Sequence, residues 1–473
     1  MRSIFHNISP LDHRYSLSEE PLYNALIPWI SEEASVKACI KAEIALIIAH
    51  LSINGKMTEG LRKDLEEAGE QVDPNEVYEE EKKISHFMRA LVNVLQKKLS
   101  PELAPLVHLG ATSVDILDTS LSLRILCLTR EVLLPELVKL ELLLCDFAEK
   151  EAGTPQLGRT HGQHAVPITL GFAIAEYVSR LGKSILEIER LEKNLKGKLA
   201  GAVGAYNATS MIVSDPVELE RLYLAELGLE PSEHSTQLVE PEYLLRLLLE
   251  FNISFGIIAN LADDLRNLQR SEIDELREGF SAEQVGSSTM PQKRNPWNSE
   301  HVKSLWKAFM PRVMTFFMDQ ISEHQRDLTN SASQRFIADY IAGFTLAVNR
   351  MAKVVKGLGV NRERLLGNLR GGSGAILAEP AYILLAEADA HEVIRRITLI
   401  AEKEKLSFSA ALENDGEAID RISAKMAELG LIKPGENKKR EALDWFAKPE
   451  QYNGLATSKA QSIALKYRKI FRR

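Results

Sequence analysis

Cysteine is scarce in this sequence. The 473 residues include only Cys39, Cys127 and Cys145, and each of them lies in an apolar helical pattern. A dense disulfide framework of the kind found in small secreted proteins is therefore excluded, and the sequence predicts a reducing compartment. The N-terminus, MRSIFHNISPLDHRY, also lacks the uninterrupted apolar core of a secretory signal. We therefore expect the protein to stay in the cytoplasm.

Excess positive charge is missing as well. The chain has 58 Lys and Arg against 66 Asp and Glu, a formal net charge of −8, which argues against a general nucleic-acid binder. The basic residues Lys466 to Arg473 are interpreted as a solvated terminal helix. The most apolar stretch, Tyr243 to Leu265, contains Arg246 and Glu250, whereas a membrane span needs about 20 predominantly apolar residues. The sequence predicts a buried bundle helix there and no membrane partner.

Strand signals are few, and long helical patterns replace them. Several of these patterns are at least twice as long as the mean helix of about 11 or 12 residues. They cover Asp115 to Gly153, with a kink at Pro135, Ile168 to Leu199, Glu240 to Leu268, Asn298 to Asp327 and Ser333 to Leu358. Long apolar helices need neighbours on more than one side. We predict an all-α fold with a long central helix bundle completed by homo-oligomerisation.

Two interruptions of the helical patterns suggest domain boundaries. One is Val107 to Ser113, and the other is Leu369 to Ala375. The length of the chain also favours more than one domain. We predict an N-terminal helical domain over residues 1–110, a central long-helix domain over 111–362 and a C-terminal helical domain over 363–473.

Four polar segments interrupt the helices: Lys82 to Phe87, Val107 to Asp115, Leu157 to Pro167 and Gly286 to Pro296. Each alone has an ordinary structural explanation, such as a buried histidine or a helix-capping pair at Thr112 and Ser113. On that interpretation the protein is a helical scaffold. His161 and His164 have no further ligands nearby in spacing, so no metal site is predicted. The GxxxxGK[ST] phosphate-binding loop is absent from the sequence.

The segment GSSTMPQKRNP, Gly286 to Pro296, carries groups suited to proton removal. Lys293 and Asn295 are donors suited to a carboxylate, and Ser287 or Ser288 can serve as a base where cations and N–H groups stabilise its alkoxide. A second group must protonate the departing atom. His161 is the best candidate, because imidazole has an unperturbed pKa of about 6.5. Together these groups suggest a β-elimination next to a carboxylate.

Three segments resemble the active-site regions of the fumarase/aspartase superfamily. They are GSSTMPQKRNP, GATSVDILDT and GRTHGQHAVPITLG, and the resemblance extends from Ser9 to Ala456. Members of this superfamily cleave C–N or C–O bonds to release fumarate. The resemblance implies a three-domain all-α chain and a homotetramer whose active sites are shared between subunits. It also implies that neither a metal nor an organic cofactor is used.

One branch of the superfamily, which acts on succinyl-purine nucleotides, is similar in SPLDHRY, RTHGQHA, MPQKRNP and QRDLTNSASQR. This resemblance implies that Ser287 removes the succinyl proton, that His161 protonates the leaving nitrogen and that Glu300 orients His161. The substrate-binding residues that it implies are Arg14, Tyr15, His86, His108, Thr112, Ser113, Thr160, Gln237, Lys293, Asn295, Arg326, Ser331 and Arg335.

Some positions depart from that branch. Phe87 follows His86 where an Asp is common, which leaves the role of His86 open, and His13 replaces a common Gly. GATSVDILDT and ILAEPAYILLAE are also similar to 3-carboxy-cis,cis-muconate cycloisomerase, the alternative activity. That branch lacks the His of RTHG and the RDxxxS pattern, both of which this chain has. A non-catalytic homologue is a further alternative.

Overall fold

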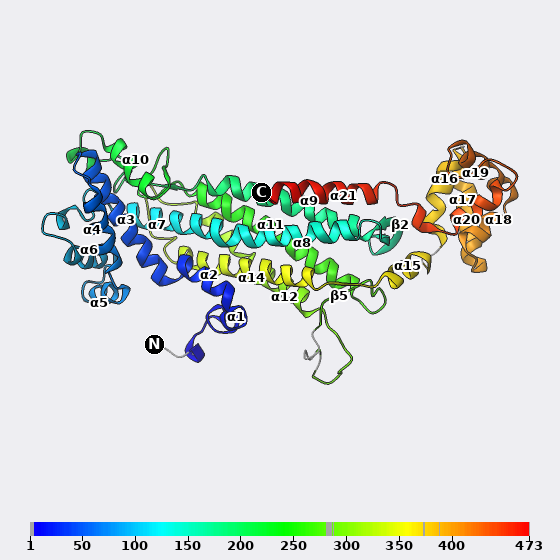
Figure 1. Cartoon of the computed structure of the whole chain (residues 1–473), viewed down its shortest axis with the longest axis horizontal. Helices are drawn as coiled ribbons and strands as arrows, with labels where there is room; N and C mark the ends of the chain where they lie inside the picture. Colours follow the sequence, from blue (N-terminus) through cyan, green and yellow to red (C-terminus); the bar gives the residue numbers. More distant parts are fainter. Residues whose placement is uncertain (1–3, 281–285, 287, 372–373, 387, 473) are drawn as a thin grey trace. The chain divides into compact units, whose positions relative to one another are not determined.

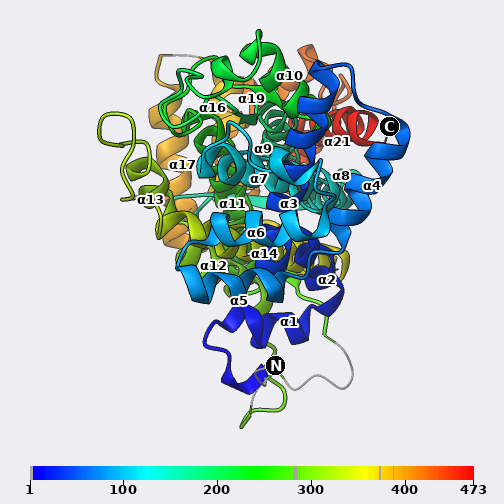
Figure 2. The same cartoon turned by 90° about the vertical axis from the view of Figure 1, so that its left-hand side faces the viewer.

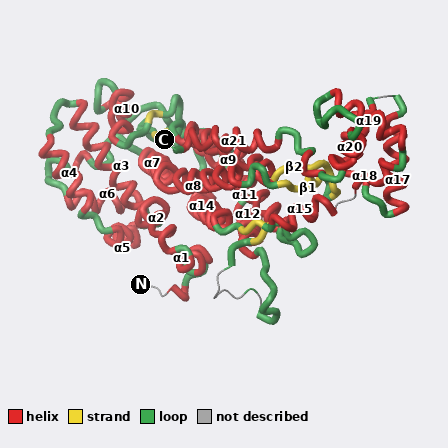
Figure 3. The backbone as a smooth tube through the Cα atoms, turned by 45° about the vertical axis from the view of Figure 1, so that its right-hand side comes forward, coloured by secondary structure: helices red, strands yellow, loops and turns green. Residues whose placement is uncertain are grey.

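The computed structural model describes residues 4–280, 286, 288–371, 374–386 and 388–472 (Figure 1). Helices dominate these residues, and the few strands are short (Figure 3). The prediction of an all-α fold is confirmed. Two compact units are present, and the division into three sequence domains stays a prediction. Unit 1 comprises Met1–Val138, Lys183–Gly256 and Ser304–Asn349, and unit 2 comprises Lys139–Gly182, Ile257–Lys303 and Arg350–Arg473.

Unit 1 contains the N-terminal helices and two short paired strands. The helices are α1 (Arg14–Ser18), α2 (Glu20–Ile30), α3 (Glu32–Ile53), α4 (Glu59–Glu70), α5 (Pro74–Ile84), α6 (Phe87–Lys98), α7 (Ser113–Leu128), α10 (Pro216–Glu226) and α13 (Arg312–Met318), and the strands are β3 (Lys196–Gly197) and β4 (Glu230–Pro231).

The unit boundaries fall within five longer helices, so the two parts of each are described with different units. These helices are α8 (Leu134–Lys150), α9 (Leu170–Glu192), α11 (Glu242–Leu268), α12 (Trp297–Phe309) and α14 (Ile337–Lys356). Within the described part of the chain, α11 alone has the length and mean hydropathy of a membrane span, and 56% of its apolar window is buried. A core helix of a soluble protein passes the same test, so these properties agree with the bundle helix predicted there.

Helix α3 is the centre of the N-terminal part of unit 1, where it packs against α7 and α10 (Figure 2). Its sequence is apolar on nearly every side, and such a helix is stable only when neighbours surround it. Ser31 caps its first turn by accepting a hydrogen bond from Ala34 N at 3.1 Å. The buried polar residues Glu43 and His50 interrupt this apolar helix, and both contact the loop before α7.

Aromatic side chains form the core between α11, α13 and α14 in unit 1. The ring of Phe344 lies 5.8 Å from that of Phe251 and 5.2 Å from that of Phe255. Phe316 packs edge-on against Tyr340 at 5.1 Å. Such tilted and edge-on pairs stabilise a core beyond the area that they bury. These contacts join helices that are distant in the sequence.

Two predicted helices are interrupted in the structure. The predicted helix Asn298 to Asp327 is wrong as a single element, because α12 ends at Phe309 and α13 begins after Pro311. Proline has no N–H and clashes with the preceding turn. The predicted helix Asp115 to Gly153 contains a π-helical turn, Thr129–Leu133, between α7 and α8. That irregular turn lies just before Pro135 and replaces the simple kink expected there.

Unit 2 contains a β-hairpin, a second strand pair and the C-terminal helices. The strands are β1 (Pro155–Thr160), β2 (Gln163–Thr169), β5 (Leu276–Arg277) and β6 (Gly359–Val360), and the helices are α15 (Arg362–Gly371), α16 (Ala378–Leu385), α17 (Ala390–Glu404), α18 (Phe408–Glu413), α19 (Gly416–Glu428), α20 (Lys438–Phe446) and α21 (Ala456–Phe471). Helices α16 to α20 share a hydrophobic core that includes Ile397, Phe408, Ile422 and Phe446.

Helix α21 packs closely against α9 within unit 2. A Cβ atom at Gly182 would lie 2.3 Å from the ring of Tyr467, so only glycine allows this approach. Arg468 bridges to Asp146 at 2.9 Å and to Glu149 at 2.5 Å on α8. The basic C-terminal segment is therefore a helix, and part of its charge is paired within the chain.

Candidate active site

The first turn of α7 brings Thr112 and Ser113 together in unit 1. Thr112 is the N-cap, and its backbone N–H donates to Asp115 Oδ2 at 2.8 Å, which forms a capping box. The capping explanation for this pair is therefore correct in the structure. A helix N-terminus also favours negative charge through its free N–H groups and its dipole. The same turn can thus be both a cap and a carboxylate contact.

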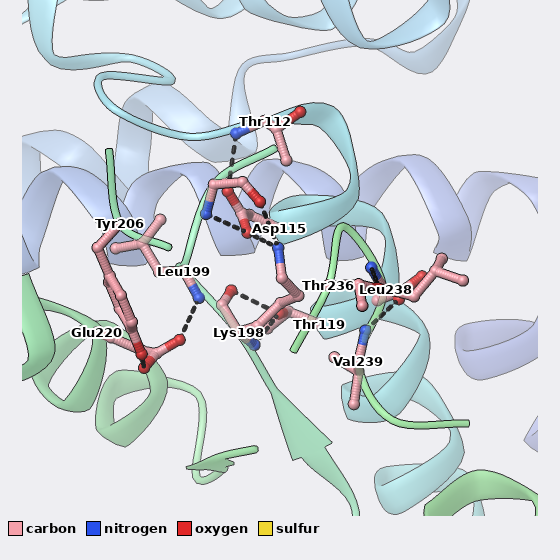
Figure 4. A network of polar contacts seen from close by, with 12 residues as sticks. Thr112, Asp115, Thr119, Lys198, Leu199, Tyr206, Glu220, Thr236, Leu238 and Val239 are labelled. Atoms are coloured by element: carbon pink, nitrogen blue, oxygen red, sulfur yellow. Dashed lines mark hydrogen bonds and ion pairs between the residues drawn. The ribbon is translucent and has the colours of Figure 1, made fainter. Parts of the chain in front are cut away.

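A buried ion pair supports this turn. Lys198 Nζ pairs with Asp115 and also donates to Gly201 O at 3.1 Å, and both charged side chains are fully buried. Gly201 N donates to the same carboxylate at 3.3 Å. Figure 4 shows Asp115 between Thr112 and Lys198. Removing one partner of a buried pair leaves an uncompensated charge, so this network fixes the start of α7 firmly.

A second polar contact extends this network along the segment after β3. Leu199 N donates to Glu220 Oε1 at 2.6 Å, and Tyr206 OH donates to Glu220 Oε2 at 2.5 Å (Figure 4). Burial raises the pKa of Glu220, while both hydrogen bonds lower it. Sequence reasoning missed Lys198 and Glu220, because a single polar residue far from its partner carries no local signal.

His108 is held by a buried carboxylate. Its Nδ1 lies 2.6 Å from Glu43 Oε1, and its backbone N–H donates to Glu43 Oε2 at 2.9 Å. Glu43 is fully buried. When Nδ1 donates to the carboxylate, the neutral ring presents Nε2 as an acceptor. The structure therefore gives His108 a fixed orientation, and Glu43 is a supporting residue that the sequence did not reveal.

His86 has a structural role at the start of α6. Its Nδ1 accepts a hydrogen bond from Arg89 N at 3.1 Å, so the ring is the N-cap of the helix that begins at Phe87. Ser85 before it has a left-handed backbone with φ of 55°. These contacts account for the polar segment Lys82 to Phe87 without a ligand. Binding of substrate by His86 stays a prediction.

Two loops of unit 1 meet at Gln237. Its backbone N–H donates to Gln325 O at 3.3 Å, which places it beside the loop that contains Arg326. Arg326 Nε donates to Asp327 O at 3.0 Å. Ser331, farther along this loop, and Arg335, in the short 3-10 helix Ser333–Phe336 that follows, are exposed. The structure thus brings Gln237 close to the segment of Arg326.

Arg14 and Tyr15 begin α1, also in unit 1. Ser9 caps the short turn before them by accepting from Leu11 N at 3.3 Å. Arg14 is exposed, and an arginine there is free to present its planar fork of donors to an anion. An exposed arginine at this position is consistent with phosphate binding, which stays a prediction.

His161 and Thr160 lie at the tip of a β-hairpin in unit 2, within the polar segment Leu157 to Pro167 that interrupts the helical patterns. Thr160 pairs with Gln163, and Arg159 pairs with His164. The two turn residues, His161 and Gly162, have φ values of 56° and 73°, as in the tight turns that match the twist of paired strands. This strand pair was not predicted, and the His-Gly dipeptide was the available turn signal. Both His161 and Thr160 are exposed.

Glu275 anchors the base of this hairpin. It is fully buried and accepts from Arg159 Nη2 at 2.6 Å, from Gln156 Nε2 at 2.9 Å and from Asn368 Nδ2 at 2.9 Å. Several donors satisfy this buried carboxylate, as a buried charge requires. These hydrogen bonds therefore hold the base of the hairpin in place, and the exposed tip carries His161.

The described residues of the segment Gly286 to Pro296 form a loop closed at its ends. Asn295 Nδ2 donates to Gly286 O at 3.3 Å, and a Cβ at Gly286 would lie 2.3 Å from Lys293 O. Ser287 lies outside the described residues. Ser288 and Lys293 are exposed. The loop therefore presents polar groups from a closed base, although the amide of Asn295 contacts the backbone in this structure.

Helix α12 begins directly after this loop. Glu278 accepts from Ser299 N at 2.8 Å and from Asn298 N at 3.2 Å, which caps the helix. Glu300 is exposed on its first turn. Among the described residues of one chain, Glu300 and His161 form no hydrogen bond or ion pair with each other. Orientation of His161 by Glu300 therefore stays a prediction for the assembled protein.

Comparison with known proteins identifies the class. A lyase family model matches residues 14–308, and a model described as adenylosuccinate lyase C-terminal matches residues 322–433. The fold is similar to that of 3-carboxy-cis,cis-muconate lactonizing enzyme from Pseudomonas putida, with a TM-score of 0.79, 24% identity and coverage of 95% of this chain and 98% of that one. Fumarate lyase from Mesorhizobium sp. BNC1 is also similar, with a TM-score of 0.77 and 19% identity over 94% and 97% of the two chains. The chain belongs to the lyase family, as its motifs predicted.

Relatives with similar sequences show to which group of lyases the chain belongs. Adenylosuccinate lyase from Pyrococcus abyssi is 32% identical over 96% of this chain and 97% of its own length. The enzyme of the same name from Pyrococcus horikoshii is 34% identical over 90% of this chain and 94% of its own length. Within the lyases, the chain belongs to the adenylosuccinate lyases. The two solved structures share less than 25% identity with this chain and show the fold alone.

Proposed function

We propose that this protein cleaves adenylosuccinate to AMP and fumarate, and SAICAR to AICAR and fumarate, in purine biosynthesis. The observation that carries the proposal is identity of 30% or more with adenylosuccinate lyases over nearly the whole chain. The residues that the reaction needs, Ser287, His161, Lys293 and Glu300, are all present in the sequence. A cytoplasmic enzyme is expected.

The proposed reaction is an anti elimination. Ser287, as the alkoxide, takes the proton from the carbon beside a succinyl carboxylate, and the negative charge that develops spreads onto that carboxylate. The C–N bond then breaks, the C=C bond of fumarate forms, and His161 gives its proton to the departing nitrogen. Lys293, Asn295, Thr112 and Ser113 would stabilise the carboxylates, because donors aimed at developing charge lower the barrier.

The other end of the substrate is a nucleotide. We assign its phosphate and ribose to a group of exposed or partly exposed residues of unit 1, and the succinyl or base region to Gln237. Arginine suits the phosphate because its planar fork engages two oxygens at once. The residues of this group are Arg14, Tyr15, Arg326, Ser331 and Arg335.

The direct test is an ultraviolet assay of the purified protein. With adenylosuccinate, and then with SAICAR, we expect the absorbance change that accompanies release of fumarate and of AMP or AICAR. Chromatography of the products provides the control. A folded protein that turns over neither substrate would contradict the proposal, and carboxymuconate and argininosuccinate would then be tested.

We further propose a homotetramer whose active sites are shared between subunits. Support comes from side chains that a single chain leaves exposed. His161, Lys293 and Glu300 are exposed, and so are large apolar residues on and near α13, namely Met314, Phe317, Met318, Ile321, Leu328 and Phe336. Exposed apolar clusters of this kind commonly mark protein interfaces. The proposed bundle would cover them.

A shared site predicts complementation between inactive variants. Mixing His161→Gln with Ser287→Ala after partial unfolding and refolding should restore activity, because some sites in the mixed oligomer receive both intact residues. The measurement is the ultraviolet assay on the mixture and on each variant treated in the same way. Mixed oligomers without any restored activity would count against sites assembled from different subunits.

A further inference from the structure

Asp118 lies on α7, close to the turn that contains Thr112 and Ser113. Its Oδ2 accepts a hydrogen bond from Val239 N at 3.0 Å. It is partly exposed, but to a cavity of about 70 Å³ whose lining includes Ser122, Leu238, Glu240, Asp319 and Asn330. The carboxylate therefore faces this cavity and holds the loop that forms one of its walls.

That loop is short and tightly folded. Ser235 and Val239 form a bridge across its base. Within it, Thr236 N donates to Leu238 O at 3.1 Å, and Leu238 N donates to Thr236 Oγ1 at 3.2 Å (Figure 4). Gln237 occupies the middle of this loop. Because the loop is internally bonded, a contact at Val239 fixes the position of Gln237 as well.

The loop is held from its other side by the Arg326 segment. Gln237 N donates to Gln325 O at 3.3 Å. The positive charge of Arg326 also acts on Asp118 and lowers its pKa. Asp118 is thus linked to two substrate-binding segments, one through a hydrogen bond and the other through its charge.

Burial, opposed by nearby donors and positive charges, sets the pKa of Asp118. Burial raises its pKa to about 6, and the negative charge of Asp115 acts in the same direction. The N–H of Val239 and the positive charges of Lys198 and Arg326 lower the pKa. The other acidic groups that line the cavity are Glu240 and Asp319, and burial raises the pKa of Asp319 as well.

We propose that Asp118 is a positioning residue for substrate binding: its carboxylate holds the 235–239 loop so that Gln237 meets the substrate. This inference rests on the proposed function. Asp118 touches no substrate itself and acts through Val239 and Gln237. Its loss should therefore weaken binding more than it slows the chemical step.

The sign of the pH dependence follows from the hydrogen bond. Above pH 6 the ionised carboxylate accepts strongly from the Val239 N–H, because hydrogen bonds to charged acceptors are stronger than neutral ones. As the pH falls through about 6, the proton that binds Asp118 weakens this contact. KM for adenylosuccinate is therefore expected to rise at acid pH.

The experiment compares three variants of the full-length protein. Asp118→Ala removes the acceptor and should raise KM roughly tenfold, the size expected from losing one hydrogen bond to a charged group, with kcat nearly unchanged. Asp118→Asn keeps only a neutral acceptor oxygen, so its KM at pH 8 should lie between those of the wild type and Asp118→Ala, near the value that the wild type reaches at acid pH. Its KM should lack the acid rise that the wild type shows. Ser122→Ala, in the same cavity and on the same helix, is the matched control and should behave as wild type.

Several outcomes would overturn the inference. They are a wild-type KM in Asp118→Ala, a loss in Asp118→Asn as large as in Asp118→Ala, or an unchanged acid rise in Asp118→Asn. If Asp118→Ala does not fold, the pH profile of Asp118→Asn decides alone. Wild-type protein without turnover would instead refute the proposed function, so the two failures are distinguishable.

Discussion

Replacing Ser287 by alanine is expected to abolish turnover of adenylosuccinate while the oligomer and substrate binding persist. Alanine lacks the hydroxyl that would accept the succinyl proton, and general acid–base groups contribute roughly a hundredfold to ten-thousandfold to a rate. The measurement is kcat in the ultraviolet assay, together with substrate binding by calorimetry and the oligomeric state by light scattering. Loss of kcat with retained binding assigns Ser287 to the chemical step.

The adjacent hydroxyl provides a matched control. Ser288→Ala changes an exposed residue of the same loop and should leave most of the activity. The two serines are equivalent in residue type, and only the resemblance to the superfamily selects Ser287. If Ser287→Ala kept near-normal turnover and Ser288→Ala lost it, the base would be Ser288.

His161→Gln is expected to have a comparably large effect on elimination. Glutamine forms hydrogen bonds but cannot release a proton near neutral pH, so the nitrogen would have to leave without protonation. We expect a loss of roughly a hundredfold or more in kcat. The measurement is kcat as a function of pH. The pH–rate profile of the variant should lack the change in kcat that comes from titration of the imidazole.

Two further variants separate chemistry from backbone strain. His161→Asn suits the left-handed turn better than Gln, because Asn tolerates positive φ, and it should be equally inactive. His164→Gln, on the opposite strand, should keep its activity. If His161→Gln remained active, the acid would be His86 or His108. Of these, His108 is the better oriented, since Glu43 holds its Nδ1.

Much of the fold could be predicted because local patterns determine it. The long apolar stretches became α9, α11 and α14, and the Thr-Ser pair at 112 and 113 became a capped helix start. Pro311 shows the limit of such patterns, since a single ring divided the predicted helix Asn298 to Asp327. The hairpin around His161 was missed because its strands are short and their pattern is weak beside the helices.

The supporting residues of the candidate site could not be predicted from the sequence. Glu43 meets His108 across 65 residues of sequence, Asp115 meets Lys198 across 83, and Gln156 meets Glu275 across 119. In each pair, a charged or polar residue lies inside an apolar stretch. Its partner is brought into contact only when segments that are distant in the sequence pack together. The motif residues were visible because they cluster in short segments.

The turn at His161 also limits how this position can change during evolution. Its φ of 56° is one that few side chains adopt without strain, chiefly Gly, Asn, Asp and His. Of these, only His ordinarily releases a proton near neutral pH. Gly and Asn would preserve the turn and lose the proton, whereas a larger acid such as Glu would strain the turn. If His161 has its proposed role, histidine alone among these residues satisfies both the backbone conformation and the proton transfer, so we expect selection against other residues at position 161.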